Sequence, residues 1–144
     1  MDEIGYLIKR AQHALRLTID NALAALGLTL PQYIALVHIQ NEAGISNAEL
    51  ARRAFVTPQT MHRVVTGLAE RGLLAVESHP QLERVKQIFV TATGQALLAA
   101  SAEIMAAAEA APLAAFSEAE QETFRAMLER YLSALATGSE DDDV

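Results

Sequence analysis

The chain has 144 residues, of which 51% are apolar and 5% aromatic, a composition that excludes an intrinsically disordered protein and favours one compact, mainly helical domain. The absence of cysteine excludes disulfides, thiolate metal sites and cysteine redox switches. The net charge of −7 argues against a nucleic-acid partner unless basic residues are concentrated in one segment. No uninterrupted apolar run of 18 residues occurs and the acidic start is unlike a signal peptide, so we expect a cytoplasmic protein.

The charge is distributed unevenly along the chain. Residues 46–86 contain six basic and four acidic side chains, a net charge of +2, whereas the remainder contains five basic and fourteen acidic side chains, a net charge of −9. The middle segment is therefore the part that could approach phosphate groups without strong repulsion.

Two helices are predicted at the start of the chain. Apolar residues recur at helical spacing over residues 3–26, which predicts a long first helix that stops at Gly27. Thr29 is a candidate N-cap and Pro31 suits a first turn, so a second helix is predicted from there to Gly44.

A third, short helix is predicted next, because Ser46 and Glu49 have the spacing of a capping box. It should run to about Arg53. Only residues 54–56 separate it from a fourth helix over residues 57–71, so we expect the third and fourth helices to be joined by a tight turn.

The fourth predicted helix has a clear start and two different faces. Thr57 is its N-cap, Pro58 takes the first position and Gly72 follows the last turn. At about 100° per residue, the polar side chains lie opposite an apolar seam. A glutamine suits a bidentate contact to adenine and an arginine suits guanine or phosphate, so this face could read DNA. The predicted contacts are Thr57, Gln59, Thr60, His62, Arg63 and Thr66.

After the fourth helix the sequence becomes β-prone. The segments "LLAVES" and "VKQIFVT" flank "HPQLER", which predicts a hairpin with an irregular tip. Helix, short turn, helix and hairpin in this order predict a winged helix-turn-helix, in which the start of the second helix enters the major groove of DNA.

Two more helices are predicted after the hairpin. An alanine-rich helix runs from Ala92 to near Pro112, and a second capping box, Ser117 with Glu120, opens an amphipathic helix. Alanine- and leucine-rich terminal helices must bury a face, which indicates a dimer. The predicted fold class is mostly α with a small β-hairpin wing. The predicted divisions are an N-terminal dimerisation helix (1–28), a winged helix-turn-helix lobe (29–93), C-terminal dimerisation helices (94–137) and a disordered acidic tail (138–144).

Three segments in this order resemble the MarR family of bacterial transcription regulators: "LGLTLPQYIALVHI", "SNAELARRAFVTPQTMHRVVTGLAERGLL" and "VTATGQALL". The resemblance covers nearly the whole chain. It implies an obligate homodimer, held by interlocked terminal helices, that places two winged helices on a pseudo-palindromic operator. It also implies a repressor released by a small phenolic or aromatic-acid ligand, with Arg63 at the position of a commonly basic DNA contact.

The wing departs from the family pattern. The Asp-x-Arg motif of the family falls on Leu82, Glu83 and Arg84, so the arginine is present and leucine replaces the aspartate that orients it. Arg84 is the predicted minor-groove contact and Lys86 a second phosphate contact. Since an arginine in a narrow minor groove must be held in place, we expect a weaker contribution from the wing than from the helix.

The resemblance also implies a ligand pocket between the first helices and the DNA-binding lobe. The candidate residues are His13, Arg16, Tyr33 and Val37. Titratable or cationic groups beside aromatic and aliphatic walls suit a small aromatic carboxylate. Alternatively, these four residues pack in the dimer interface.

Two other functions stay open. His38 and Glu42 have the i, i+4 spacing of a metal-ligand pair, which would suit a metal-responsive regulator of the same fold, although we identify no third ligand and predict neither a metal nor a cofactor. A winged-helix module for protein–protein assembly is the second alternative, favoured by the net charge of −7. We predict no enzymatic activity, because the chain has no nucleophile motif and no phosphate-binding glycine loop.

Overall fold

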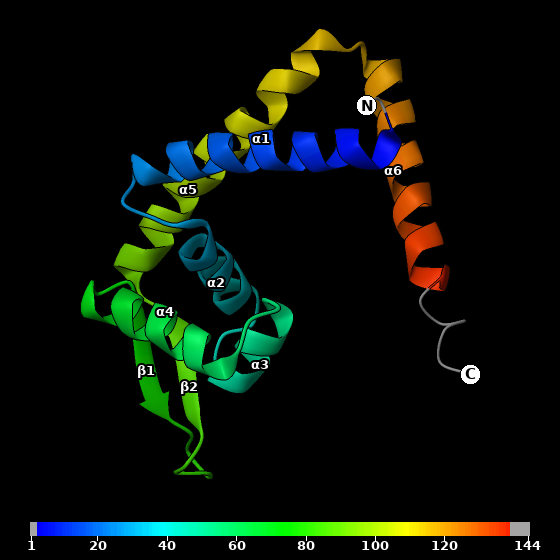
Figure 1. Cartoon of the computed structure of the whole chain (residues 1–144). Helices are drawn as coiled ribbons and strands as arrows, with labels where there is room; N and C mark the ends of the chain where they lie inside the picture. The colour runs from blue at the N-terminus through cyan, green and yellow to red at the C-terminus, as the bar shows by residue number, and fades with distance from the viewer. Residues whose placement is uncertain (1–2, 139–144) are drawn as a thin grey trace. The chain divides into compact units, whose positions relative to one another are not determined.

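The computed structural model describes residues 3–138, which belong to two compact units divided between Ala108 and Glu109. The first unit holds α1 (Ile4–Ala24), α2 (Leu30–Asn41), α3 (Asn47–Arg53), α4 (Pro58–Glu70), β1 (Leu74–Ser78), β2 (Lys86–Val90) and most of α5 (Ala92–Ala110), as Figure 1 shows. The second unit holds a 3₁₀ turn (Ala111–Ala115) and α6 (Glu118–Gly138). Helices with one two-stranded antiparallel hairpin confirm the predicted fold class.

Two of the predicted helix starts have complete capping boxes. The Thr29 hydroxyl accepts the backbone N–H of Gln32 at 3.3 Å, and the Gln32 side chain accepts the backbone N–H of Thr29 at 3.0 Å. Ser117 and Glu120 make the same reciprocal pair, at 3.2 and 2.9 Å. Each box satisfies two backbone donors that the helix itself leaves free, which is why α2 and α6 begin where the sequence predicts.

The predicted capping box of α3 is only half formed. The Ser46 hydroxyl accepts the backbone N–H of Glu49 at 3.2 Å, as expected. The Glu49 carboxylate, however, turns away from the Ser46 backbone and accepts hydrogen bonds from Arg52 and Arg53, 2.9 and 3.1 Å from their Nε atoms. A guanidinium is a charged donor and binds a carboxylate more strongly than a neutral backbone N–H does.

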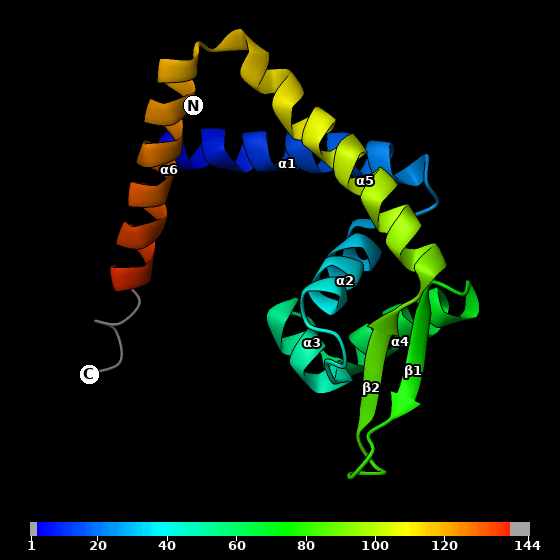
Figure 2. The same cartoon turned by 180° about the vertical axis from the view of Figure 1, so that it is seen from behind.

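The hydrophobic core of the first unit lies where α2, α3 and α4 meet. Leu36 of α2, Leu50 of α3 and Leu68 of α4 are completely buried, and Ile88 of β2 closes the core from the hairpin side. Figure 2 shows the hairpin extending beyond α4 on the side away from α1. The only buried residues of α1 are Ile19 and Leu23, near its end. The core therefore supports α4 directly and leaves most of α1 outside it.

The hairpin pairs Leu74 with Val90 at its base and Ser78 with Lys86 near its tip. A third backbone segment joins it, because Ile45 forms an isolated antiparallel bridge with Ile88. The sequence predicts two strands, and nothing in its pattern indicates this bridge. It connects the hairpin to the segment that leads into α3.

The junction between the hairpin and α5 is tightly bonded. Thr91 donates its backbone N–H to the Leu73 carbonyl at 3.1 Å and its hydroxyl to the Gly72 carbonyl at 2.6 Å. Gly94, in the first turn of α5, lies so close that an added Cβ would be 2.2 Å from the Leu73 carbonyl oxygen. A glycine is therefore required where α5 leaves the hairpin.

The segment Ala92–Ala115 is long and apolar enough to cross a membrane, by length and composition alone. An uninterrupted apolar run is absent here, because the polar residues Gln95, Ser101 and Glu103 lie within the segment. Within the first unit, Met105 is buried in the core, and Leu97 and Leu98 of α5 pack against the core. Only 11% of the most apolar stretch of this segment is buried, so most of that stretch is exposed.

The second unit leaves the apolar side chains of α6 exposed. Phe116 and Phe124 stack with their ring centroids 6.0 Å apart. Further along the helix, Met127, Leu132 and Leu135 are each more than half exposed. α6 ends at Gly138, so the rest of the predicted acidic tail, residues 139–144, lies outside the described residues.

Candidate nucleic-acid interface

α4 has the two faces that the sequence predicts. Met61, Val65 and Leu68 are buried against the core, with exposed fractions of 1%, 5% and 0%. All six side chains predicted to contact DNA on this element are exposed: Thr57, Gln59, Thr60, His62, Arg63 and Thr66. The structure thus brings this polar set together on one helix and its N-cap.

The start of α4 is fixed by two sets of hydrogen bonds. The Thr57 hydroxyl accepts the backbone N–H of Thr60 at 3.1 Å and lies 2.9 Å from the Thr60 hydroxyl. Asn47, the first residue of α3, donates its side-chain amide to the Pro58 carbonyl at 2.9 Å. This second bond links the two helices of the helix-turn-helix and was missed by the sequence analysis, which gives a residue inside a predicted helix no tertiary partner.

The basic residues of α3 are neutralised by neighbouring carboxylates. Arg52 bonds to Glu49, and Arg53 bonds to both Glu49 and Glu42. The hydrogen bonds from Arg52 and then Arg53 lower the pKa of the Glu49 carboxyl from 4.5 to about 2. Glu49 is already counted in the net charge of residues 46–86, whereas Glu42 lies outside this segment, so α3 presents less positive charge to phosphate than that net charge suggests.

Two other basic residues of the middle segment are also engaged. Arg71 donates to the Gly27 carbonyl at 2.8 Å, which ties the end of α4 to the turn after α1. Lys86 donates to the Ser78 hydroxyl at 3.0 Å. Within residues 3–138, Arg63 and Arg84 are the basic side chains of this segment that make no hydrogen bond or ion pair. These two guanidinium groups, one on α4 and one on the wing, are the ones most available to DNA.

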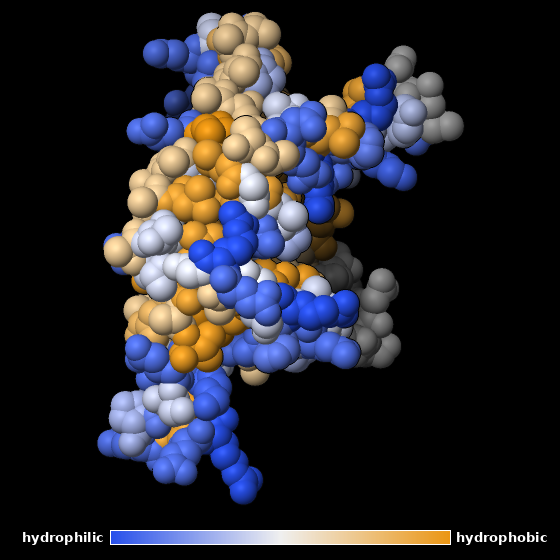
Figure 3. Space-filling model, turned by 90° about the vertical axis from the view of Figure 1, so that its left-hand side faces the viewer, coloured by the Kyte–Doolittle hydropathy of each residue, from blue (hydrophilic) through white to orange (hydrophobic). Residues whose placement is uncertain are grey.

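His79 organises the tip of the wing. Its ring Nδ1 accepts the backbone N–H groups of Gln81 and Leu82, both at 3.1 Å, and its own backbone N–H donates to the Val85 carbonyl at 2.8 Å. The Leu82 side chain, at the position of the family's aspartate, is 58% exposed. The projecting tip is otherwise strongly hydrophilic (Figure 3). This role of His79 has no signal in the sequence, because the three bonds depend on the closed conformation of the loop.

The four predicted ligand residues do not line one pocket. Arg16 lines a cleft of about 650 Å³ between the end of α1, the start of α2 and α4, where it pairs with Asp20 at 3.7 Å. Thr60 and Arg63 of α4 line the same cleft. Tyr33 and Val37 are partly buried and line neither this cleft nor the one described next.

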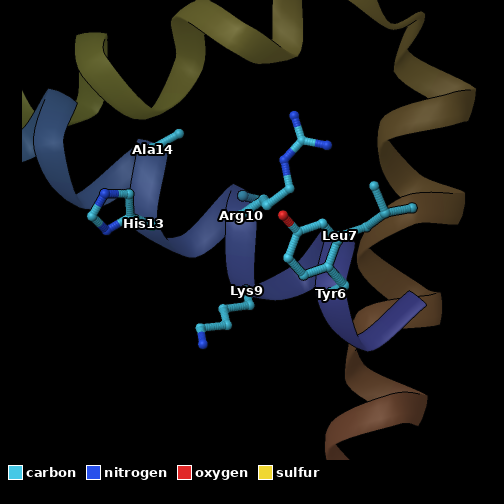
Figure 4. Close-up of a pocket in the computed structure, with 7 residues that line it drawn as sticks. Tyr6, Leu7, Lys9, Arg10, His13 and Ala14 are labelled. Atoms are coloured by element: carbon cyan, nitrogen blue, oxygen red, sulfur yellow. The ribbon is translucent and has the colours of Figure 1, made fainter. Parts of the chain in front are cut away.

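His13 lines a separate, open pocket of about 640 Å³ on α1. Figure 4 shows its lining side chains projecting from that one helix, with the Arg10 guanidinium 5.8 Å from the centre of the Tyr6 ring. A pocket lined by a single helix cannot enclose a ligand by itself.

The possible metal pair His38 and Glu42 gains no third ligand. The Glu42 carboxylate is bound by Arg53. In the part of the chain that the structure describes, no group of three histidine, cysteine, aspartate or glutamate side chains could hold a metal ion.

The comparisons with known proteins agree with the observed fold. Residues 26–84 match the sequence profile of the MarR family. The chain is 38% identical over 127 residues to the HTH-type transcriptional repressor Rv2887 of Mycobacterium tuberculosis, an alignment that covers 88% of this chain and 91% of the relative. The crystal structure of Rv2887 in complex with DNA matches 91% of this chain and 98% of that one, with a TM-score of 0.78 and 37% identity. The crystal structure of Rv2887 with salicylic acid matches 91% and 97%, with a TM-score of 0.72 and 37% identity.

Proposed function

Because the chain belongs to the MarR family of transcription regulators, we propose that it is a homodimeric, cytoplasmic transcriptional repressor that binds a pseudo-palindromic DNA operator and is released by a small aromatic acid. The observation that carries the proposal is the exposed polar face of α4, which stands on a buried core. Its alternatives are an assembly module that binds only protein and a regulator that responds to metal.

DNA binding is assigned to α4 and the hairpin. α4 supplies donors and acceptors for base edges from Gln59, His62, Arg63 and Thr66, and the hairpin supplies Arg84 and Lys86. The Thr57 cap and the bond from the Asn47 amide to the Pro58 carbonyl hold the start of α4 in a fixed position, so little conformational entropy is lost when it enters the major groove. The DNA complex of Rv2887 supports this assignment by similarity.

Dimerisation is assigned to the terminal helices. The first half of α1 exposes Ile4, Leu7 and other apolar side chains, and every apolar residue of the described part of α6 is at least one-third exposed. Exposed apolar stripes of this length on a monomer mark an interface. Sedimentation equilibrium across a concentration series would measure the assembly, and a stable monomer would contradict it.

The effector site is assigned to the cleft that contains Arg16. The Arg63 guanidinium makes no ion pair and can bind a carboxylate, whereas Arg16 would exchange its 3.7 Å pair with Asp20 for the ligand. Leu30 and Val64 supply apolar wall. The salicylic acid complex of Rv2887 supports this class of ligand. Since Arg63 is also on the DNA face, an anion bound here would compete with DNA for the same side chain.

The first experiment is a titration of the full-length protein with duplex DNA from the region that flanks its own gene, repeated at several salt concentrations. Specific binding should weaken steeply with salt, because each neutralised phosphate contributes about −0.9 to the slope of log K against log salt. An unrelated duplex of equal length is the control. Absence of salt-dependent binding to any fragment would favour the protein-assembly alternative.

The second experiment measures thermal unfolding with millimolar salicylate. A ligand at about 100 times its Kd raises the free energy of unfolding by about 2.7 kcal/mol. Arg16→Ala should remove this stabilisation, whereas Lys9→Ala, on the same helix but outside the cleft, should retain it. Equal stabilisation of both variants would place the ligand elsewhere.

A further inference from the structure

Phe55 occupies an unusual conformation in the turn between α3 and α4. Its φ of 56° lies in the left-handed region, and no other non-glycine residue among the described ones has a positive φ. Gly27, Gly44 and Gly72 adopt similar values at other turns. A side chain with a Cβ is strained in this region, so glycine would be the less costly residue at position 55.

The side chain of Phe55 gains nothing from the fold that would offset this strain. It is 96% exposed, the highest value among the large apolar residues that the structure describes. The residues on either side, Ala54 and Val56, pack against the core instead. Folding therefore stabilises the turn through its neighbours and leaves the phenyl ring in water.

The ring stands beside the proposed DNA-reading surface. Phe55 precedes the N-cap Thr57 by two residues, and residues 57–60 are all exposed. The backbone is fixed there, because Val56 donates its N–H to the Ala51 carbonyl at 3.1 Å and Asn47 ties α3 to Pro58. The ring is thus held outward beside the N-terminal end of α4, the helix proposed to enter the groove.

We infer that Phe55 is an apolar DNA contact, which packs against the 5-methyl group of a thymine or the C–H edge of a deoxyribose when α4 is in the major groove. This inference rests on the proposed function. Both partners offer apolar surface at the groove wall, and phenylalanine is one of the side chains that read a thymine methyl. A protein partner is less well matched, because the nearest exposed residues along the chain on either side of the ring, Arg52 and Thr57, are polar.

The experiment compares full-length wild type with Phe55→Gly, Phe55→Asn and Phe55→Leu, using a duplex that the wild type binds. Glycine relieves the strain and removes the ring, asparagine tolerates the left-handed region but is polar, and leucine keeps both strain and apolar bulk. The glycine and asparagine variants should unfold at or above the wild-type temperature yet bind roughly 5- to 30-fold more weakly. The leucine variant should retain more affinity than the asparagine variant.

A second arm replaces each thymine of the duplex by uracil, which lacks the methyl group. If one replacement weakens binding of the wild type but not of Phe55→Gly, the partner is a thymine methyl. If no replacement does so while the variants still bind more weakly, the partner is the deoxyribose edge.

Wild-type affinity in both the glycine and asparagine variants would overturn the inference and leave the proposed function intact. So would an altered oligomeric state with unchanged DNA affinity, which would identify a protein contact. If the wild type binds no duplex in a salt-dependent manner, the proposed function fails first and the inference fails with it.

Discussion

α4 and the tip of the wing are the two elements proposed to touch DNA, and they are held in place by different forces. α4 rests on Met61, Val65 and Leu68, which are buried in the hydrophobic core. The wing tip has no buried side chain between residues 79 and 86, and it is held by the three hydrogen bonds of His79 and by the backbone bond from Val85 to the Leu82 carbonyl at 2.8 Å. The helix should therefore keep its conformation as long as the lobe is folded, whereas the wing can lose its conformation locally.

The largest effect is expected from breaking the support of α4. Leu68→Ala removes a completely buried side chain and leaves a cavity, which should lower the free energy of unfolding by about 2–5 kcal/mol. Chemical denaturation of the full chain measures this value. Leu82→Ala, an equal truncation at the exposed wing tip, is the matched control and should change stability little. Similar decreases in both variants would mean that the tip is packed as well as the helix.

The next largest effect is a loss of DNA affinity without a loss of folding stability. Arg63→Ala should weaken operator binding by about 1–3 kcal/mol if the guanidinium contacts a base, because a bidentate pair is removed. Its melting temperature should stay near that of the wild type, since Arg63 is exposed and makes no bond within the described chain. Lys9→Ala removes one positive charge from α1 and serves as the charge-matched control. Unchanged affinity in Arg63→Ala would remove this residue from the interface.

The wing should respond through its salt dependence. Arg84→Ala and Lys86→Ala should each reduce the magnitude of the salt slope by about 0.9 for every phosphate that the variant no longer neutralises. Neither should change the base pairs preferred by α4. Complete loss of binding in Arg84→Ala would make the wing, rather than α4, the main anchor.

His79→Ala tests whether the wing is positioned by this ring. Removing the two acceptor bonds at 3.1 Å should free the tip and weaken binding, with little change in melting temperature. Hydrogen exchange at the Gln81 and Leu82 amides should accelerate in this variant, and Gln81→Ala, which keeps the ring, is the control. Unchanged exchange would assign the order of the tip to the strands and to the backbone bond between Val85 and Leu82.

The smallest effect is a loss of stability in acid. Because its pKa is lowered from 4.5 to about 2 in the folded protein, the Glu49 carboxylate stabilises the fold above pH 4.5, and this contribution disappears as the pH falls towards 2. Wild type should therefore lose more stability across this window than Glu49→Gln does. Parallel pH dependence of the two proteins would show that the bonds to Arg52 and Arg53 contribute nothing in solution.

The parts of the fold that depend on local chemistry could be predicted from the sequence. Thr29, Thr57 and Ser117 cap the helices that the sequence assigns to them, because a cap is formed by residues three apart. The seam of α4 follows from helical periodicity.

The rest could not be predicted, because it depends on competition or on distant contacts. Glu49 had a predicted local partner but binds two arginines instead. Asn47 bonds to Pro58, 11 positions away, and the conformation of Phe55 has no sequence signal. The bonds of His79 are local, but they form only when the loop closes on the ring. Nor can spacing along the chain reveal that Arg16 and Arg63, 47 positions apart, line one cleft.

Thr91 bonds to the Leu73 carbonyl and Gly94 lies against it, so the base of the hairpin is attached directly to the start of α5. Five strand residues at about 3.3 Å each extend roughly 17 Å from this junction. A rotation of the hairpin by about 10° at this junction would then displace its tip by about 3 Å, the length of one hydrogen bond. A small movement of α5 should therefore produce a larger displacement at the wing tip. Gly94→Ala would alter this junction without changing a residue of α4 or of the wing tip, the two elements proposed to contact DNA.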